Sequence, residues 1–148
     1  MSDILHRITI DAPAEKILPA ITTAEGFRNW WTDDCDAVPK VGSVNIFRFH
    51  GGAVEFHFRV DELLPNRVAW TSLAAPKVPE EWVGTRITFD LSPADNGGTV
   101  LRFGHREWGS TEGEFPACNT VWGDLMHRLK ESVEGKTRGP YFSYRPQG

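Results

Sequence analysis

The chain has 148 residues, a formal net charge of -4 at pH 7, and 40% hydrophobic and 24% charged residues. This length and balance are typical of one globular domain that can bury a core, so we expect a single domain over residues 1–148. An acidic chain without a run of Lys and Arg argues against nucleic acid and against an anionic membrane as partner, because both bind basic patches.

The N-terminus carries no long apolar run, so the sequence predicts neither a signal peptide nor a membrane-spanning helix. The two cysteines, Cys35 and Cys118, lie far apart and form no CxxC motif. The simpler interpretation is a cytoplasmic protein in which both cysteines are free thiols, and not a disulfide scaffold. We therefore expect a cytoplasmic protein.

Residues 5–10, "LHRITI", alternate between apolar and polar side chains and predict a strand. Pro13 suits the first turn of a helix, which we expect over residues 14–23 with a kink at Pro19. A second short helix is expected over residues 24–31, ending in the pair Trp30 and Trp31.

From residue 44 the hydrophobic pattern changes to a period of two, which predicts antiparallel strands. Turns are expected at "HGG" (residues 50–52) and "DNGG" (residues 95–98), and a Pro-rich loop over residues 74–81. The predicted strands span residues 44–49, 54–62, 67–72, 85–91 and 99–106.

The tail is different, because its apolar residues recur with a period near 3.6 and predict one long helix over residues 115–133. The stripe consists of Cys118, Val121, Trp122, Leu125, Met126, Leu129 and Val133. We expect an α+β fold with two short helices after the first strand and a curved antiparallel sheet that grips this C-terminal helix.

Four segments together resemble the START-like helix-grip superfamily, and within it the group related to the C-terminal domain of the Hsp90 ATPase activator Aha1. They are "ITIDAPAEKILPAIT", "FRNWW", "EWVGTRITFDLSPADNGGTVLRFGH" and "VWGDLMHRLKESVEG". The resemblance implies a helix-grip fold with a cavity between sheet and last helix. It does not imply one activity, because relatives include lipid carriers, hormone receptors, polyketide cyclases and chaperone co-factors.

Alternation along the strands and the stripe on the helix predict which side chains face this cavity. The candidate ligand-binding residues are Trp31, Phe56, Phe58, Trp70, Phe89, Phe103, His105, Cys118, Trp122 and Met126. The alternative for each is a plain core position, and Trp70, Phe89 and Trp122 are large enough to fill the cavity.

His105 is the candidate for catalysis, as an acid or a base that points inward with Leu101 and Phe103. The alternative, which we favour, is a core histidine whose nitrogens are satisfied within the protein. The five histidines have no metal-binding spacing, and no phosphate-binding or dinucleotide glycine motif is present, so no metal and no cofactor are predicted.

The tryptophans pose a separate question, because adjacent residues cannot fill the same core position of one helix or strand. Our hypothesis is that Trp30 packs in the core and that Trp31 borders the mouth of the pocket. The alternative for Trp31 is a cover over the loop of residues 33–38. Trp82 and Trp108 flank one hairpin pair and are expected to form an aromatic patch for a ligand or a dimer contact.

The preferred interpretation is a binding protein for a hydrophobic or amphipathic small molecule held between sheet and C-terminal helix. One alternative is an enzyme similar to polyketide cyclases or dehydratases, with His105 as acid or base. A third is a protein-interaction module, either a homodimer or a chaperone-associated domain.

Overall fold

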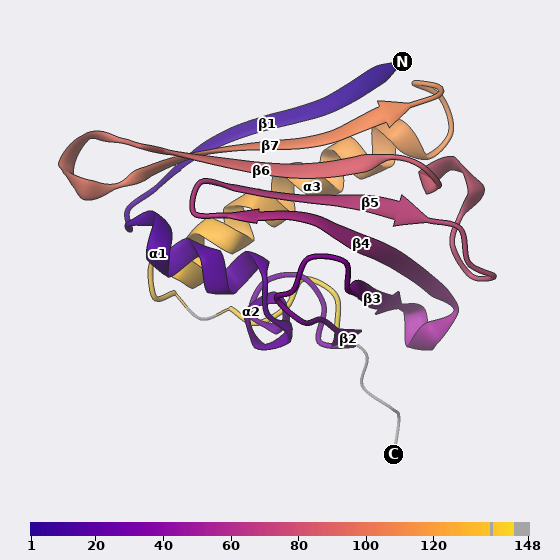
Figure 1. The fold of residues 1–148 in the computed structure, drawn as a ribbon, viewed down its shortest axis with the longest axis horizontal. Coiled ribbons are helices and arrows are strands. Elements are labelled where there is room, and N and C mark those ends of the chain that lie inside the picture. Colours follow the sequence, from indigo (N-terminus) through magenta and orange to yellow (C-terminus); the bar gives the residue numbers. More distant parts are fainter. Residues whose placement is uncertain (137, 144–148) are drawn as a thin grey trace.

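A seven-stranded sheet, crossed on one face by one long helix, forms the centre of the computed structural model, which describes residues 1–136 and 138–143 (Figure 1). Every neighbouring pair of strands is antiparallel, and the spatial order is β1-β7-β6-β5-β4-β3-β2. The strands are Ser2–Ile10 (β1), Cys35–Asp36 (β2), Val44–Phe49 (β3), Val54–Leu64 (β4), Arg67–Leu73 (β5), Arg86–Pro93 (β6) and Thr99–Trp108 (β7).

The helices agree with the α+β prediction: two short ones follow β1, and one long one is the last helix of the described chain. Their bounds are Ala14–Ile17 (α1), Ala24–Arg28 (α2) and Glu114–Val133 (α3). Single 3₁₀ turns are Leu18–Ile21 (η1), His50–Gly52 (η2), Glu80–Trp82 (η3) and Asp95–Gly97 (η4). The predicted curved sheet gripping a C-terminal helix is confirmed.

The expected kink at Pro19 is the change from the α-helix α1 to the 3₁₀ turn η1, because proline removes a backbone donor from the helix. The next helix, α2, begins after Thr23, whose hydroxyl accepts a hydrogen bond from the Gly26 N–H at 3.0 Å. Gly26 lies so close to η1 that a Cβ there would be 2.1 Å from the Pro19 carbonyl oxygen. The small residue therefore lets α2 pack directly on η1.

Alternation on the strands places their apolar side chains in one core, as the sequence predicts. Phe56, Phe58 and Val60 on β4 are buried, whereas Glu55 and His57, which alternate with them, face outward. β4 also carries a register irregularity between Val60 and Glu62, which adds local twist to the sheet.

The helix α3 buries Trp122, Leu125, Met126 and Leu129 against the concave face. These are four members of the predicted apolar stripe, so the stripe does cover the sheet. No helix in the described part of the chain is both long and apolar enough to cross a bilayer.

Two features of the sheet were not predicted. The two-residue strand β2 has no period of its own and forms because Cys35 and Asp36 pair with Phe47 and Ile46 of β3. The first strand pairs with the last, Ile4 opposite His105 and Ile8 opposite Leu101, and no local pattern encodes this long-range pairing.

Candidate functional site

Both tryptophans of the pair are buried, with Trp30 fully enclosed and Trp31 only 2% exposed. This is sterically allowed because α2 ends at Arg28, so the two residues lie beyond the regular helix. Their rings stack on each other with centroids 5.8 Å apart. Trp30 Nε1 donates to the Ala20 carbonyl oxygen at 2.8 Å, which ties this ring to the short helices.

The ring of Trp31 lies between β3 and α3. It stacks on Phe47 of β3 with centroids 4.4 Å apart and contacts Trp122 of α3 at 5.3 Å. The backbone is held by the C-terminal segment, because the Phe142 N–H donates to the Trp31 carbonyl oxygen at 2.8 Å. Thr32 Oγ1 adds a bond to the Arg48 carbonyl oxygen at 3.1 Å.

A pocket of about 380 Å³ lies at one end of the space between sheet and helix. Its base is formed by Trp31, Trp122 and Leu125, all of which are buried, while its rim reaches the exposed residues His50, Glu114 and Ala117. The remaining wall consists of Phe49, Val54, Phe56, Pro79, Trp82, Cys118, Val121 and Phe142. Six of the fourteen lining residues carry a Phe or Trp ring, so aromatic side chains form a large part of the walls.

The ten candidate ligand-binding residues fall into two groups. Four of them, Trp31, Phe56, Cys118 and Trp122, line this pocket. The other six lie outside its lining, in the packed space between sheet and helix: Phe58, Trp70, Phe89, Phe103, His105 and Met126. Side chains of the described residues thus fill much of the grip, and the pocket lies where β4 begins and α3 starts.

Sequence reasoning missed other wall residues. Phe49 lies on β3 with the same alternation as Phe47, which is a signal that could have placed it on the inner face. Phe142 has no such signal, because its position depends on pairing with residues near Trp31 and not on any local period.

His105 is a fully satisfied core residue. Its side chain is completely buried, Trp122 Nε1 donates to its Nδ1 at 3.1 Å, and its Nε2 lies 2.8 Å from Thr85 Oγ1. The Thr85 hydroxyl in turn donates to the Trp82 carbonyl oxygen at 2.6 Å. Because Nδ1 must accept, the proton lies on Nε2, and burial lowers the pKa of the imidazole to about 3. Neither nitrogen is left to serve a substrate.

Trp82 and Trp108 do lie together, with ring centroids 5.7 Å apart. They are only 6% and 1% exposed, however, and they pack around His105 at 4.5 and 4.7 Å. The expectation of an exposed aromatic patch is therefore wrong for Trp108, which is buried and has Phe115 of α3 packed against its ring at 5.7 Å. Trp82 presents its remaining edge to the pocket.

Cys118 lines the pocket as a half-buried thiol. Its pKa is raised to about 12, mainly by burial and also by the negative charges of Glu114 and Glu81, while a hydrogen bond with Trp82 acts in the opposite direction. The thiolate is the nucleophilic form of cysteine, so this side chain is inert near neutral pH. Cys35 is also a free, buried thiol whose pKa is raised to about 11 by burial.

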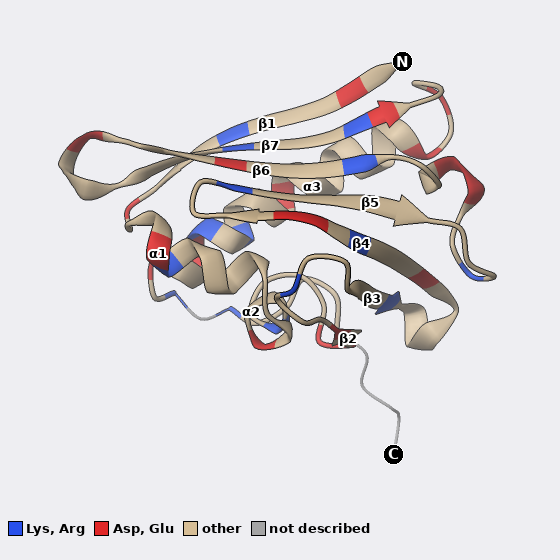
Figure 2. Ribbon diagram, in the orientation of Figure 1, with Lys and Arg blue, Asp and Glu red and all other residues tan. Residues whose placement is uncertain are grey.

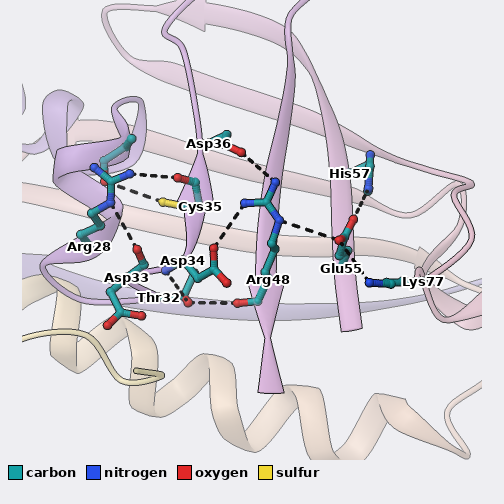
Figure 3. A network of polar contacts seen from close by, with 11 residues as sticks. Arg28, Thr32, Asp33, Asp34, Cys35, Asp36, Arg48, Glu55, His57 and Lys77 are labelled. Atoms are coloured by element: carbon teal, nitrogen blue, oxygen red, sulfur yellow. Dashed lines mark hydrogen bonds and ion pairs between the residues drawn. The ribbon is translucent and has the colours of Figure 1, made fainter. Parts of the chain in front are cut away.

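A charged network covers the outer face of β3 and β4, on the side of the sheet away from the core (Figure 3). Arg48 pairs with Asp34 at 3.3 Å, Asp36 at 2.8 Å and Glu55 at 3.7 Å. Its pKa is raised, first by the hydrogen bond with Asp36.

The network continues through Glu55, which accepts from His57 at 3.0 Å and lies 3.9 Å from Lys77. The pKa of the Glu55 carboxyl is lowered, first by the hydrogen bond with His57. These ion pairs hold the edge strand β2 and the loop after Trp31 against β3, which makes their role structural. No group of three or more His, Cys, Asp or Glu side chains in the described residues is arranged to hold a metal ion.

Comparison with known proteins gives a match to one family model, described as "Activator of Hsp90 ATPase homolog 1-like protein", over residues 11–134. No curated protein is significantly similar in sequence. Among solved structures, the Aha1 dimer from Colwellia psychrerythraea is 39% identical, with 92% of this chain and 98% of that chain covered and a TM-score of 0.82.

Two more distant structures show the same fold. Protein MLL2253 from Mesorhizobium loti is 20% identical, with 90% of this chain and 97% of that chain covered and a TM-score of 0.77. DynU16, a protein of the dynemicin biosynthetic locus, is 19% identical with a TM-score of 0.75, and the match covers 97% of this chain and 51% of that one.

Proposed function

This chain belongs to the activator of Hsp90 ATPase homolog 1-like family, and from that premise we propose that it binds a hydrophobic or amphipathic small molecule in the aromatic pocket. The observation that carries the proposal is an open pocket of about 380 Å³ in an otherwise tightly filled grip. Pockets that hold small ligands are of this order of size, mostly apolar, with few polar groups.

The composition of the walls supports the same class of ligand. Aromatic rings come from β3, β4, η3, α3 and the segment around Phe142, so they surround the pocket from several sides. A hydrophobic molecule that enters would remove exposed apolar surface from water, which is the usual source of affinity in such sites.

The test is native mass spectrometry of the protein as purified from cells, followed by the same sample after denaturation. A mass excess that is present in the native spectrum and lost on denaturation supports a carried ligand, and its value begins to identify the compound. The proposal is rejected if the native mass is that of the bare chain and a panel of hydrophobic compounds produces no bound species.

Two variants locate the binding site. Ala117→Trp adds bulk at the pocket rim, whereas Asn119→Trp adds the same bulk on an exposed position of α3 that does not line the pocket. We expect the first variant to lose the bound mass and the second to keep it. Loss in both variants, or in neither, places the ligand elsewhere.

A second candidate function is assembly with another copy of the chain, and the dimeric state of the 39%-identical Aha1 structure favours it. β1 is an edge strand of the sheet, paired only with β7, and Leu5 on it is 59% exposed. An unpaired edge can extend its sheet by pairing with a second chain. Light scattering on the wild type and on a Leu5→Lys variant tests this, since a dimer through β1 should become a monomer in the variant.

The name of the family also supports a chaperone-associated role as part of this second candidate. The direct assay is the ATPase rate of a purified Hsp90 with and without the chain. An unchanged rate at saturating concentrations rejects this role without affecting the ligand-binding proposal.

The enzyme alternative draws no support from His105. An acid or base of the polyketide-cyclase kind must reach its substrate, but this imidazole lies outside the pocket lining, and both nitrogens bond within the protein.

A further inference from the structure

The charge of the ligand can be inferred from the ionisable groups around the pocket, given the binding function proposed above. Three of the lining residues can ionise: Glu114, His50 and Cys118. No Lys or Arg occurs among the described residues that line it. A carboxylate or sulfate head group would therefore find no permanent positive charge in the walls.

Helix starts often bind anions because their first N–H groups are free, but the start of α3 is occupied. The Glu114 N–H donates to Glu81 Oε2 at 2.8 Å, and the Phe115 N–H donates to the Glu112 carbonyl oxygen. The next residue is Pro116, which has no N–H to offer. The Glu81 carboxylate therefore already occupies the position at the start of α3 where the helix dipole would favour an anion.

The nearby cation Lys77 forms its ion pair outside the pocket. Lys77, in the loop beside the start of β4, lies 3.9 Å from Glu55 on the outer face of the sheet. Acidic residues outnumber basic ones in the two loops that meet at the start of α3, the loop with η3 and the β7–α3 connection (Figure 2). These loops carry Glu80 and Glu81 in η3, and Glu112 just before Glu114.

We propose that the pocket selects ligands with a positive charge, in the class of aromatic or alkyl ammonium compounds, and discriminates against anions. The apolar body of such a ligand would lie against Trp31 and Trp122, and its cationic group would lie near Glu114 at the rim. Faces of Trp and Phe rings carry negative partial charge and attract cations, so the aromatic walls add to the effect of the carboxylate.

The thiol inside the pocket lies in the field of the same carboxylates. The negative charges of Glu114 and Glu81 both contribute to raising the Cys118 pKa, although burial is the larger cause. Carboxylates that disfavour a thiolate at this position also disfavour any other anion and favour a cation.

The experiment uses three probes with the same naphthylmethyl body: a trimethylammonium cation, the neutral alcohol and a sulfonate anion. Each is titrated into ¹⁵N-labelled protein at about pH 8, above the ordinary pKa of histidine. The indole N–H signals report the site, because Trp31, Trp82 and Trp122 line the pocket, whereas Trp30 does not and serves as a control. The same titrations are repeated with Glu114→Gln.

We expect the cation to bind about three- to tenfold more tightly than the alcohol, and the sulfonate more weakly than the alcohol by a similar factor. In Glu114→Gln the preference for the cation should fall by about threefold, with little change for the alcohol. Equal affinities for all three probes, or tighter binding of the sulfonate, overturn the charge selectivity but leave the binding function intact. If no probe shifts the indole signals of the pocket, the proposed function fails and this inference fails with it.

Discussion

His105 makes the stability of this fold sensitive to mild acid. Nδ1 of the buried ring accepts a hydrogen bond from Trp122, and Nε2 donates to Thr85. A proton added to Nδ1 would face the Trp122 N–H and would place a charge in a site that is closed to solvent. Burial accordingly lowers the pKa of this histidine from 6.5 to about 3 in the folded protein.

The sign and size of the effect follow from linkage between protonation and folding. Between pH 6.5 and about 3 the unfolded chain binds a proton at this residue and the folded chain does not, so the free energy of unfolding rises with pH in this window. The contribution is fully present above the unfolded pKa and is lost as pH falls below it. Each pH unit below 6.5 lowers the free energy of unfolding by about 1.4 kcal/mol. At pH 5 the protein has therefore lost about 2 kcal/mol of stability through this residue.

The assay is urea unfolding of the wild type and of His105→Gln at about pH 7.5 and pH 5. Glutamine can accept from Trp122 and donate to Thr85 but does not titrate, and every other ionisable group is common to both proteins. We expect the wild type to lose about 2 kcal/mol more than the variant between the two pH values. The same pH dependence in both proteins would refute a buried, neutral His105.

Three further substitutions test contacts of the fold. Gly26→Ala should lower the free energy of unfolding by about 3 kcal/mol, because the Cβ of the alanine would lie 2.1 Å from the Pro19 carbonyl oxygen. A loss below about 0.5 kcal/mol in chemical denaturation would contradict this packing. Thr85→Val should cost about 1–3 kcal/mol by leaving the His105 N–H without an acceptor, whereas Thr85→Ser should stay near the wild type in the same assay. Glu81→Ala should lower the free energy of unfolding by about 1 kcal/mol, because it removes the carboxylate that accepts from the Glu114 N–H at the start of α3. Glu81→Gln, which can still accept this hydrogen bond, should lower it less. Equal losses in the two variants would show that the hydrogen bond is unimportant.

Much of the architecture could be read from local patterns. The alternation on β4 and the stripe on α3 each reflect a single element with one buried face, and the geometry of a strand or helix alone fixes their period. Pro19 and the Asp95–Gly97 turn likewise act through their own backbone preferences. The inward direction of His105 followed from the same alternation.

The candidate site could be predicted only in part. Trp31, Phe56, Cys118 and Trp122 were expected to face a cavity and do line the pocket, but Phe58 and Met126 had the same pattern and lie in packed core. Period alone cannot separate the two outcomes, since both kinds of residue face inward. What differs is whether neighbouring side chains fill the space around each residue.

The sequence by itself therefore determined the elements, their buried faces and the helix-grip family to which they belong. Only the tertiary structure decided how far the grip is filled, which nitrogen of His105 carries the proton, and that Phe142 returns to pair near Trp31. These properties depend on curvature and on contacts between residues distant in the chain, and both arise only when all elements pack at once.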